Sequence, residues 1–370
     1  MKHAASVDFS RAPFLVIWEM TQACDLVCRH CRANAAPARS PEELTTQEAE
    51  GLIRAVREMG TGIFVFSGGD PLKRDDLEHL IGFAKDHAAR TGAIPAGSAL
   101  LTRERIQRLK QAGLDQLALS LDAPQAAEHD ALRGAEGSFE RTMQAAGWVR
   151  EAGLDLQINT MINGLAPEAL ERLMGLVVAL GAVFWEIFFL VPVGRGEEMP
   201  LATASYVEGI FERIYAFSRR APLLIKVAEA PHFRRFVFQK DSSQGKDASE
   251  AMLTRGVTPS GIRNAVRSGG RIGLSPLTVN AGRGFLFVSH RGDIMPSGFL
   301  PIVCGNVRKD PVSAVYRDHA LFQALRDPEK LQGRCGRCEY RVLCGGSRSR
   351  AYATYGDPFA EDLLCSYIPR

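Results

Sequence analysis

The stretch Cys24-Asp-Leu-Val-Cys28-Arg-His-Cys31 decides the fold of this chain, because it places three cysteines directly after an apolar run. That run, Phe14-Leu-Val-Ile-Trp18, predicts a buried strand, so the cysteines fall on the loop that leaves it. Three thiolates at this spacing can hold three irons of a 4Fe-4S cube and leave the fourth iron without a protein ligand. An iron with a vacant position is a site for chemistry.

A structural zinc site and free thiols are the alternatives for these cysteines. Structural zinc normally takes four ligands, and no fourth Cys or His with zinc-like spacing follows nearby. His30 stands between two of the cysteines, where we expect it to shape the loop. The residues therefore favour an iron-sulfur cluster.

Length and composition are those of a globular enzyme. The chain has 370 residues, of which 46% are hydrophobic and 24% charged, so it can bury a large core. Its net charge of +3 is too small to indicate nucleic acid as a partner. No apolar run is long enough to span a membrane, and the first residues lack the apolar core of a secretion signal. We expect a cytoplasmic protein that binds neither nucleic acid nor membrane.

Strand-like and helix-like segments alternate along the first 218 residues. The expected strands cover 14–18, 62–67, 93–100, 116–121, 154–161 and 184–190, and the expected helices cover 45–59, 74–89, 102–112, 139–151, 167–180 and 206–218. Such an order predicts an α/β fold with a parallel sheet and outer helices. Six strand-helix units indicate an open partial barrel, with its chemistry at the C-terminal strand ends.

The periodicity fails between about residues 230 and 273, where Arg, Lys, Ser and Gly dominate. A solvated connection is one interpretation, and a lid whose Arg234, Arg235 or Arg271 meets an anionic substrate is the other. After it, Phe285-Leu-Phe-Val288 and Arg291-Gly-Asp293 predict a β-hairpin that opens a second domain. The expected organisation is an N-terminal extension (1–13), a partial barrel (14–220), a connection or lid (221–275) and a small C-terminal domain (276–370).

A second set of cysteines, Cys335, Cys338, Cys344 and Cys365, can supply four ligands to one closed site. Spacing alone leaves both a zinc ribbon and an iron-sulfur cluster open. In a reducing compartment, the grouping of the eight cysteines favours metal over disulfides. The remaining Cys304 is expected to be a small buried thiol, with a spare ligand role as the alternative.

The turn Gly68-Gly69-Asp70-Pro71 follows the second expected strand. Paired glycines let a ligand touch the backbone, and free carbonyls with the Asp70 carboxylate can accept hydrogen bonds from an ammonium group. A plain strand-to-helix turn is the alternative for this segment.

Cys24, Cys28 and Cys31 resemble the signature of the radical S-adenosylmethionine (SAM) superfamily. In that superfamily SAM chelates the vacant iron, and an electron from the cluster cleaves SAM to methionine and a 5'-deoxyadenosyl radical that abstracts hydrogen from unactivated carbon. The resemblance implies a partial (β/α)6 TIM-like barrel, a SAM-binding 4Fe-4S cluster, and a reducing partner such as flavodoxin or ferredoxin.

The resemblance also implies SAM contacts along the strand ends. Gly68-Gly69-Asp70 resembles the superfamily's GGE-type motif, which binds the SAM amino group, although Asp stands where Glu is commoner. Ser120 and Arg133 would meet the SAM carboxylate; a buried serine and a surface arginine are the alternatives. Asn159 would bond the ribose and Leu190 would flank the adenine, and His30 completes the expected cofactor-binding set.

The C-terminal spacing resembles the SPASM or shorter twitch extension of these enzymes, in which the four thiols hold an auxiliary 4Fe-4S cluster. Ser297 and Ser347 stand where the full seven-cysteine pattern has cysteines, so we expect one auxiliary cluster and two clusters in total. Because four protein ligands leave no vacant iron for SAM, the implied role of this cluster is electron transfer.

The whole pattern looks closest to enzymes of heme and heme d1 biosynthesis and to peptide maturases. It implies hydrogen abstraction from a tetrapyrrole side chain or a peptide residue, with maturation of a ribosomally made peptide as the runner-up. An electron carrier that does not turn over SAM is the alternative from another class, and the Gly68-Gly69 turn and Arg133 argue against it. No further catalytic side chain is assigned; the candidates by type alone are Tyr340, Tyr352, Tyr355 and His290.

Overall fold

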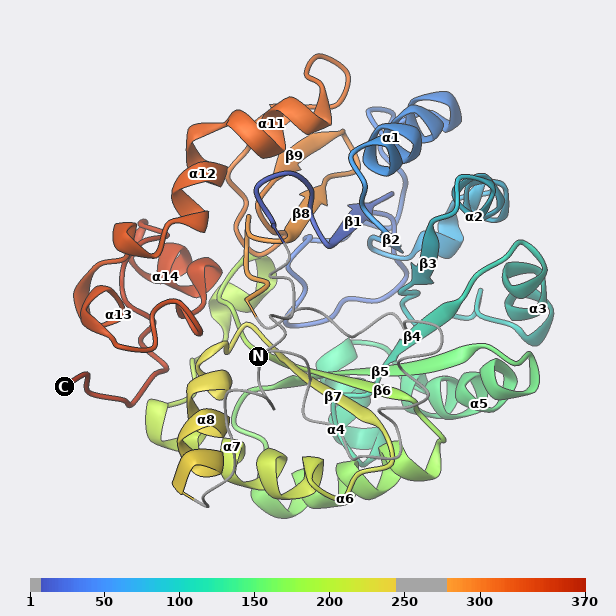
Figure 1. Ribbon diagram of the computed structural model, residues 1–370. Helices are drawn as coiled ribbons and strands as arrows, with labels where there is room; N and C mark the ends of the chain where they lie inside the picture. Colours follow the sequence, from blue (N-terminus) through green and yellow to red (C-terminus); the bar gives the residue numbers. More distant parts are fainter. Residues whose placement is uncertain (1–7, 244–277) are drawn as a thin grey trace, which may run out of the picture.

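The computed structural model describes residues 8–243 and 278–370. Seven parallel strands follow one another in one sheet: β1 (Leu15–Glu19), β2 (Ile63–Ser67), β3 (Arg90–Ala93), β4 (Gln116–Ser120), β5 (Asp155–Ile162), β6 (Phe184–Phe189) and β7 (Leu224–Ala228). The helices between them lie outside the curved sheet (Figure 1): α1 (Thr46–Glu58), α2 (Leu77–Asp86), α3 (Arg103–Gln111), α4 (Ala126–Arg133), α5 (Ser138–Glu151), α6 (Pro167–Ala179) and α7 (Ala204–Ser218). The α/β partial barrel is confirmed, and no described strand closes the sheet at β7.

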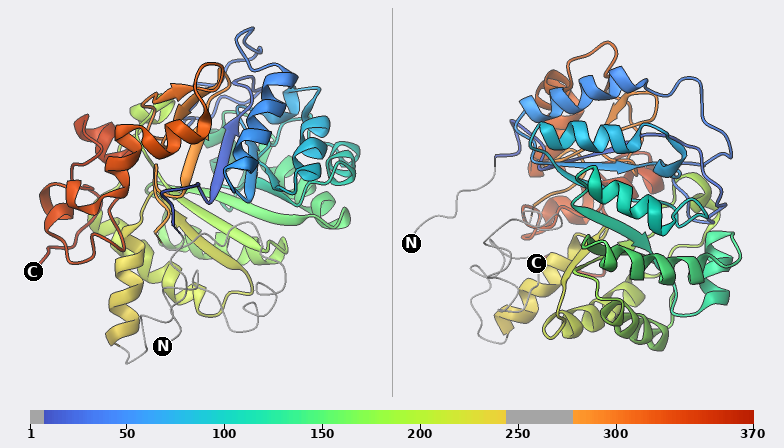
Figure 2. Two further views of the ribbon diagram at one scale, coloured as in Figure 1. Left: turned by 45° about the horizontal axis from the view of Figure 1, so that its top comes forward. Right: turned by 90° about the vertical axis from the view of Figure 1, so that its right-hand side faces the viewer.

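The C-terminal part extends the same sheet at its other edge. Strand β8 (Phe285–Val288) pairs parallel with β1, and β9 (Asp293–Met295) pairs antiparallel with β8 and with the short β10 (Gly305–Asn306). The expected hairpin is therefore present, and its first strand joins the barrel sheet. The helices α11 (Val312–Asp318), α12 (Ala320–Arg326), α13 (Gly333–Arg337) and α14 (Arg348–Tyr355) lie together at this side of the molecule, orange to red in Figure 2.

The structure differs from the expected connection or lid over 221–275, whose periodicity was expected to fail from about residue 230. Residues 224–228 form β7, and α8 (His232–Ser243) follows. Phe233 and Phe236 of α8 pack against Phe211 of α7, and the arginines between these apolar positions hid the helical period. Arg271 lies outside the described residues.

The third strand is also placed differently from the expectation. It ends at Ala93, because Pro95 has no N–H for a sheet and the amide of Ala96 lies 3.5 Å from the Asp70 carboxylate instead. The apolar residues after Ala93 leave the sheet and line a cavity. The sequence analysis also missed α4, which ends at Gly134 in the left-handed conformation (φ 62°).

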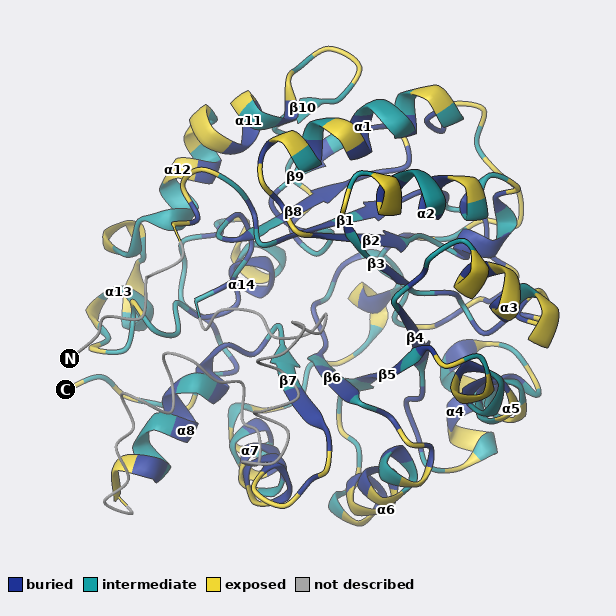
Figure 3. Cartoon of the chain, turned by 45° about the vertical axis from the view of Figure 1, so that its right-hand side comes forward, coloured by how far each residue is buried: buried dark blue, intermediate teal, exposed yellow. Residues whose placement is uncertain are grey.

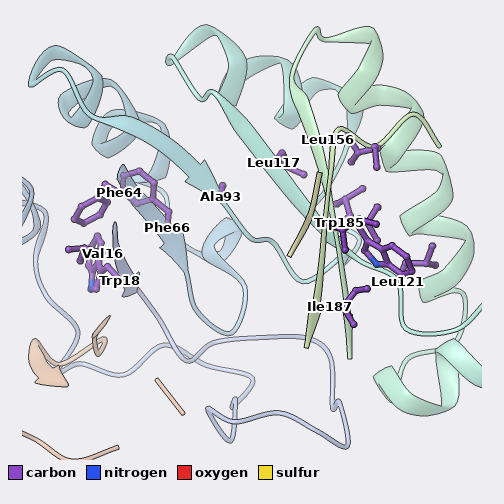
Figure 4. Packing of buried hydrophobic residues seen from close by; sticks show 14 of the residues in the cluster. Val16, Trp18, Phe64, Phe66, Ala93, Leu117, Leu121, Leu156, Trp185 and Ile187 are labelled. Carbon is purple, nitrogen blue, oxygen red and sulfur yellow. The ribbon is translucent and has the colours of Figure 1, made fainter. Parts of the chain in front are cut away.

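The core lies between the sheet and the helices. Trp18, Phe64 and Phe66 contact one another on β1 and β2 with ring centroids 5.1–6.5 Å apart (Figure 4). Helix α1 buries Leu52 and Val56 toward this face, and the helices keep their outer faces exposed (Figure 3). No helix among the described residues combines the length and apolar character of a membrane span.

Candidate active site

A cavity at the C-terminal ends of the strands collects nearly all the residues that the sequence analysis singled out. It encloses about 1010 Å³ including its open mouth. Its lining includes ten expected residues: Cys24, Cys28, His30, Cys31, Gly68, Gly69, Ser120, Arg133, Asn159 and Leu190. The three thiols thus share one chamber with polar groups from four strand ends.

The glycine pair holds the start of the cysteine loop by its backbone. The amide of Gly69 donates to the carbonyl of Thr21 (2.8 Å). A Cβ on Gly68 would stand 2.6 Å from the Thr21 carbonyl oxygen, and one on Gly69 would stand 2.6 Å from the carbonyl oxygens of Gln22 and Ala23. No side chain fits at either position, so the turn needs both glycines.

Asp70 turns away from this cavity and does not line it. Its buried carboxylate accepts hydrogen bonds from the hydroxyl of Ser98 (2.6 Å) and the amide of Leu72 (3.1 Å). Burial raises the pKa of Asp70. The side chain braces the turn from outside the cavity, so its carboxylate is not placed to meet a ligand there.

Arg133 lies buried beside the cysteine loop. Its guanidinium pairs with the Asp122 carboxylate at 2.6 Å, and its Nη1 lies 3.9 Å from the Cys28 sulfur. Burial opposes ionisation of Asp122, but the charge of Arg133, together with two nearby histidines and the Met161 amide, lowers the pKa of Asp122. The Nε of Arg133 has no hydrogen-bond partner among the described residues. A fixed cation with spare donors at this place suits a carboxylate ligand.

Arg195 is a residue of this site to which the sequence analysis gave no role. Its Nε donates to the carbonyl of Cys28 (2.8 Å), its Nη1 to that of Ala35 (3.2 Å), and its backbone amide to that of Cys31 (3.0 Å). The preceding Gly194 approaches the loop so closely that a Cβ would meet the Cys31 carbonyl oxygen at 2.6 Å. The signal that could have found it is the segment Val191-Pro-Val-Gly-Arg-Gly196, in which glycines flank the arginine.

The cysteine loop fits a bound cluster. The amide of Leu26 lies 3.4 Å from the Cys24 sulfur as a hydrogen-bond donor. Burial raises the pKa of Cys24 to about 12, so this thiol holds its proton unless a metal replaces it. His30 lines the same cavity, and its Nδ1 is buried without a hydrogen-bond partner among the described residues.

A second cavity lies deeper inside the barrel and shares Ile94, Phe188 and Phe299 with the first. It encloses about 1100 Å³ including its mouth. Inward-facing residues of β1, β2 and β3 make one wall apolar, whereas β4 to β7 contribute Gln116, Gln157, Glu186 and Lys226. The four hydrogen-donor candidates, Tyr340, Tyr352, Tyr355 and His290, line neither cavity.

The C-terminal cysteines gather at a separate pocket. Cys335, Cys338, Cys344 and Cys365 all line it. Amides point at two sulfurs, from Gly346 to Cys344 (3.3 Å) and from Asp362 to Cys335 (3.4 Å). Cys304 lies apart, packed against the core with its thiol 3.5 Å from the carbonyl oxygen of Ile302.

Two observations bear on the zinc alternative. Burial raises the pKa of Cys344 to about 12 and also raises the pKa of each of the other three thiols in this pocket. Among residues 8–243 and 278–370, no three His, Cys, Asp or Glu side chains are gathered as a metal ion requires. The same finding holds for Cys24, Cys28 and Cys31, so it does not decide between zinc and a cluster at either set.

A buried polar network joins the C-terminal pocket to the first cavity. Arg350 pairs with Asp362 at 3.1 Å, and its Nε donates to the carbonyl of Leu190 (3.2 Å). Ser347, at a position where related patterns have cysteine, donates to the Glu229 carboxylate at 2.5 Å. Ser347 therefore bonds a carboxylate that directly follows β7. Nothing in the sequence indicated this partner.

Comparisons with known proteins agree with this geometry. Residues 18–177 match the family model described as Radical SAM superfamily. The AdoMet-dependent heme synthase of Nitratidesulfovibrio vulgaris is 38% identical over 96% of this chain and 93% of its own length. The chain belongs to the radical SAM superfamily. It is therefore an enzyme, and its family implies a 4Fe-4S cluster and SAM.

Other radical SAM proteins are similar at lower identity. The PqqA peptide cyclase of Rhizobium meliloti is 26% identical over 96% of this chain and 88% of its own. The crystal structure of Streptococcus suis SuiB bound to S-adenosylmethionine shares the fold, with a TM-score of 0.71 at 16% identity over 96% of this radical SAM chain and 78% of that one.

Proposed function

We propose that this enzyme cleaves SAM reductively and uses the resulting radical to abstract hydrogen from a side chain of a tetrapyrrole. The observation that carries the proposal is the chamber in which three thiols, a glycine turn and a buried arginine meet. It shares Ile94, Phe188 and Phe299 with a second chamber inside the barrel. The tetrapyrrole is favoured because a heme synthase is the relative at 38% identity, whereas the peptide cyclase stands at 26%.

Each residue of the first chamber has a proposed role. Cys24, Cys28 and Cys31 hold the cluster, which with SAM supplies the electron and the 5'-deoxyadenosyl radical when bound. The backbone of Gly68 and Gly69 receives the SAM amino group, and Arg133 with Ser120 receives the carboxylate. Asn159 bonds the ribose, and Leu190 and His30 flank the adenine side.

Polar contacts along the barrel wall hold the side chain of Asn159 in place. Gln157 donates to the side chains of Asn159 (2.6 Å) and Glu186 (3.1 Å). Glu186 in turn pairs with Lys226 at 2.7 Å. This chain of contacts orients Asn159 in the proposed ribose site and leads from there into the second chamber.

The C-terminal thiols are proposed to hold an auxiliary 4Fe-4S cluster. Four protein ligands leave no iron for SAM, so the proposed role is to take up an electron from the substrate radical. A flavodoxin or ferredoxin is the proposed source of electrons for SAM cleavage.

The test uses anaerobically reconstituted protein with SAM and dithionite. One sample receives a porphyrin with propionate side chains, and the other receives candidate precursor peptides. We expect 5'-deoxyadenosine in step with a mass change of the porphyrin, measured by mass spectrometry. A mass change of a peptide alone would move the substrate to that class, and absence of 5'-deoxyadenosine would indicate an electron carrier.

A further inference from the structure

The charged residues that line the inner cavity differ in how their charges are balanced. Glu186 and Lys226 pair with each other, and the Glu229 carboxylate accepts hydrogen bonds from Ser347 and Ser349. Arg234 is the exception. It donates to the backbone carbonyls of Val279 (2.7 Å) and Leu343 (3.4 Å) and has no carboxylate partner among the described residues.

No carboxylate of the described residues pairs with Arg234, and the cluster proposed at Cys344 would be the other negative group near it. The nearest charged neighbours that affect it are Arg283, itself largely buried, and the thiol of Cys344. Arg234 is half-buried at the wall of the inner cavity, and its planar fork suits a carboxylate.

The neighbouring arginine shows a different arrangement. Arg235 pairs with Glu208 at 2.6 Å and lines the pocket of the four C-terminal cysteines. Arg234 lines the inner cavity of the barrel instead. Helix α8 thus presents two different arginines. The one at the cysteine pocket is paired with a carboxylate, and the one at the inner cavity has no carboxylate partner among the described residues.

We propose that Arg234 binds a carboxylate side chain of the substrate. The inference rests on the proposed function and names the group by which the substrate is held: an apolar ring system lies against the walls from β1 to β3, and one acidic arm reaches Arg234. The ligand class is a macrocycle with carboxylate arms. A peptide held by its backbone, or a neutral macrocycle, would not use this residue.

The experiment measures binding without turnover. Anaerobically reconstituted holoprotein, without reductant, is titrated with iron coproporphyrin and with its tetramethyl ester in the same co-solvent, and the porphyrin absorbance is followed. We expect the wild type to bind the acid more tightly than the ester. Arg234→Gln should weaken binding of the acid by roughly 10- to 100-fold and leave the ester unchanged.

Two further variants complete the comparison. Arg234→Lys keeps the charge and should lose part of the preference for the acid; it carries the same test if the glutamine variant fails to fold. Arg213→Gln removes an exposed arginine of α7 that pairs with Glu171, and it should bind both compounds as the wild type does. Iron content and melting temperature of all variants show that they are folded and loaded.

The outcomes separate the two proposals. Equal affinity of the wild type for acid and ester, or equal weakening of both in Arg234→Gln, would overturn the role of Arg234 while porphyrin binding still supports the function. An altered spectrum of the auxiliary cluster with the acid preference intact would also overturn it, because Arg234 would then serve the cluster. Failure of the wild type to bind either porphyrin would overturn both proposals.

Discussion

The two cysteine regions of this chain differ in what surrounds the thiols. Cys24, Cys28 and Cys31 face a chamber of about 1010 Å³ walled by strand ends and a glycine turn. The four C-terminal thiols face a pocket of about 440 Å³, mouth included, whose rim carries arginine and tyrosine side chains. Three ligands beside open space suit a cluster that binds a further molecule, whereas four ligands in a crowded pocket suit a closed one.

The local means of support differ as well. Backbone amides hold much of the N-terminal loop, since those of Gly69 and Arg195 bond carbonyls of Thr21 and Cys31 and glycines allow the approach. The Arg195 side chain adds a bond to the Cys28 carbonyl. Side chains hold the C-terminal pocket, through Arg350, Asp362 and Ser347. Backbone support leaves the chamber free of bulk, so a small molecule can reach the thiols. The predictions below test this contrast.

The largest effect is expected from the open region. Replacing Cys24, Cys28 and Cys31 together by alanine should abolish 5'-deoxyadenosine formation, because no other described site leaves an iron vacant in the proposed scheme. The iron content should fall from about eight to about four atoms per chain if the auxiliary cluster remains. Chromatography of the nucleoside and iron analysis measure both, and nucleoside production that survives would refute the assignment.

The closed region should respond differently. Cys344→Ala should keep SAM cleavage, and it should lose conversion of the porphyrin because the acceptor of the substrate electron is gone. The ratio of 5'-deoxyadenosine to porphyrin product measures this uncoupling. Loss of both activities with a folded protein and an intact N-terminal cluster would contradict the division of labour.

The glycine turn gives a graded test of the open region. Gly69→Ala should lower SAM cleavage by about 100-fold, as expected when the cysteine loop shifts by about 1 Å, since the new Cβ would meet backbone oxygens at 2.6 Å. Gly147→Ala on α5 is the control, because nothing lies within 4 Å of its Cβ. The control should cleave SAM normally and gain about 0.5–1 kcal/mol of stability.

The smallest expected effect is a change in stability when Glu229, which accepts hydrogen bonds from Ser347 and Ser349 near the C-terminal pocket, is replaced. Burial raises the pKa of Glu229, so its contribution to stability is fully present below its ordinary pKa and is lost as the pH rises through the raised value. Glu229→Gln should therefore gain stability over the wild type above about pH 4.5, by about 1.4 kcal/mol for each unit of the shift. Denaturant unfolding from pH 4 to pH 8 measures the difference, and a difference independent of pH would contradict it.

The sequence predicted the parts of the fold that depend on simple periods. Alternating strands and amphipathic helices such as α1, with its Thr45 cap, are present where the pattern placed them. Helix α8 was missed because Arg234 and Arg235 interrupt its apolar face. The pairing of β8 with β1 was not predicted either, because partners 270 residues apart leave no local signal.

The site was predicted to a similar extent. Short motifs such as the cysteine triplet and Gly68-Gly69 were recognisable in the sequence, and their residues line one chamber in the structure. Contacts that depend on three-dimensional approach were not visible, including Arg195 on the cysteine loop and Ser98 on Asp70. Asp70 shows most clearly what a motif cannot predict. Its carboxylate stabilises the turn by hydrogen bonds, although its place next to the glycines indicated contact with a ligand.

The place of β1 between β2 and β8 has a consequence for how the protein is made. The strand that feeds the cysteine loop gains its second neighbour only when residue 288 has left the ribosome, and until then it offers a bare edge. The N-terminal thiols thus reach their final setting late in synthesis, close to the time at which the C-terminal thiols emerge. In the proposed two-cluster scheme, metal loading at the two ends of the chain is in this way tied to a single late step of folding.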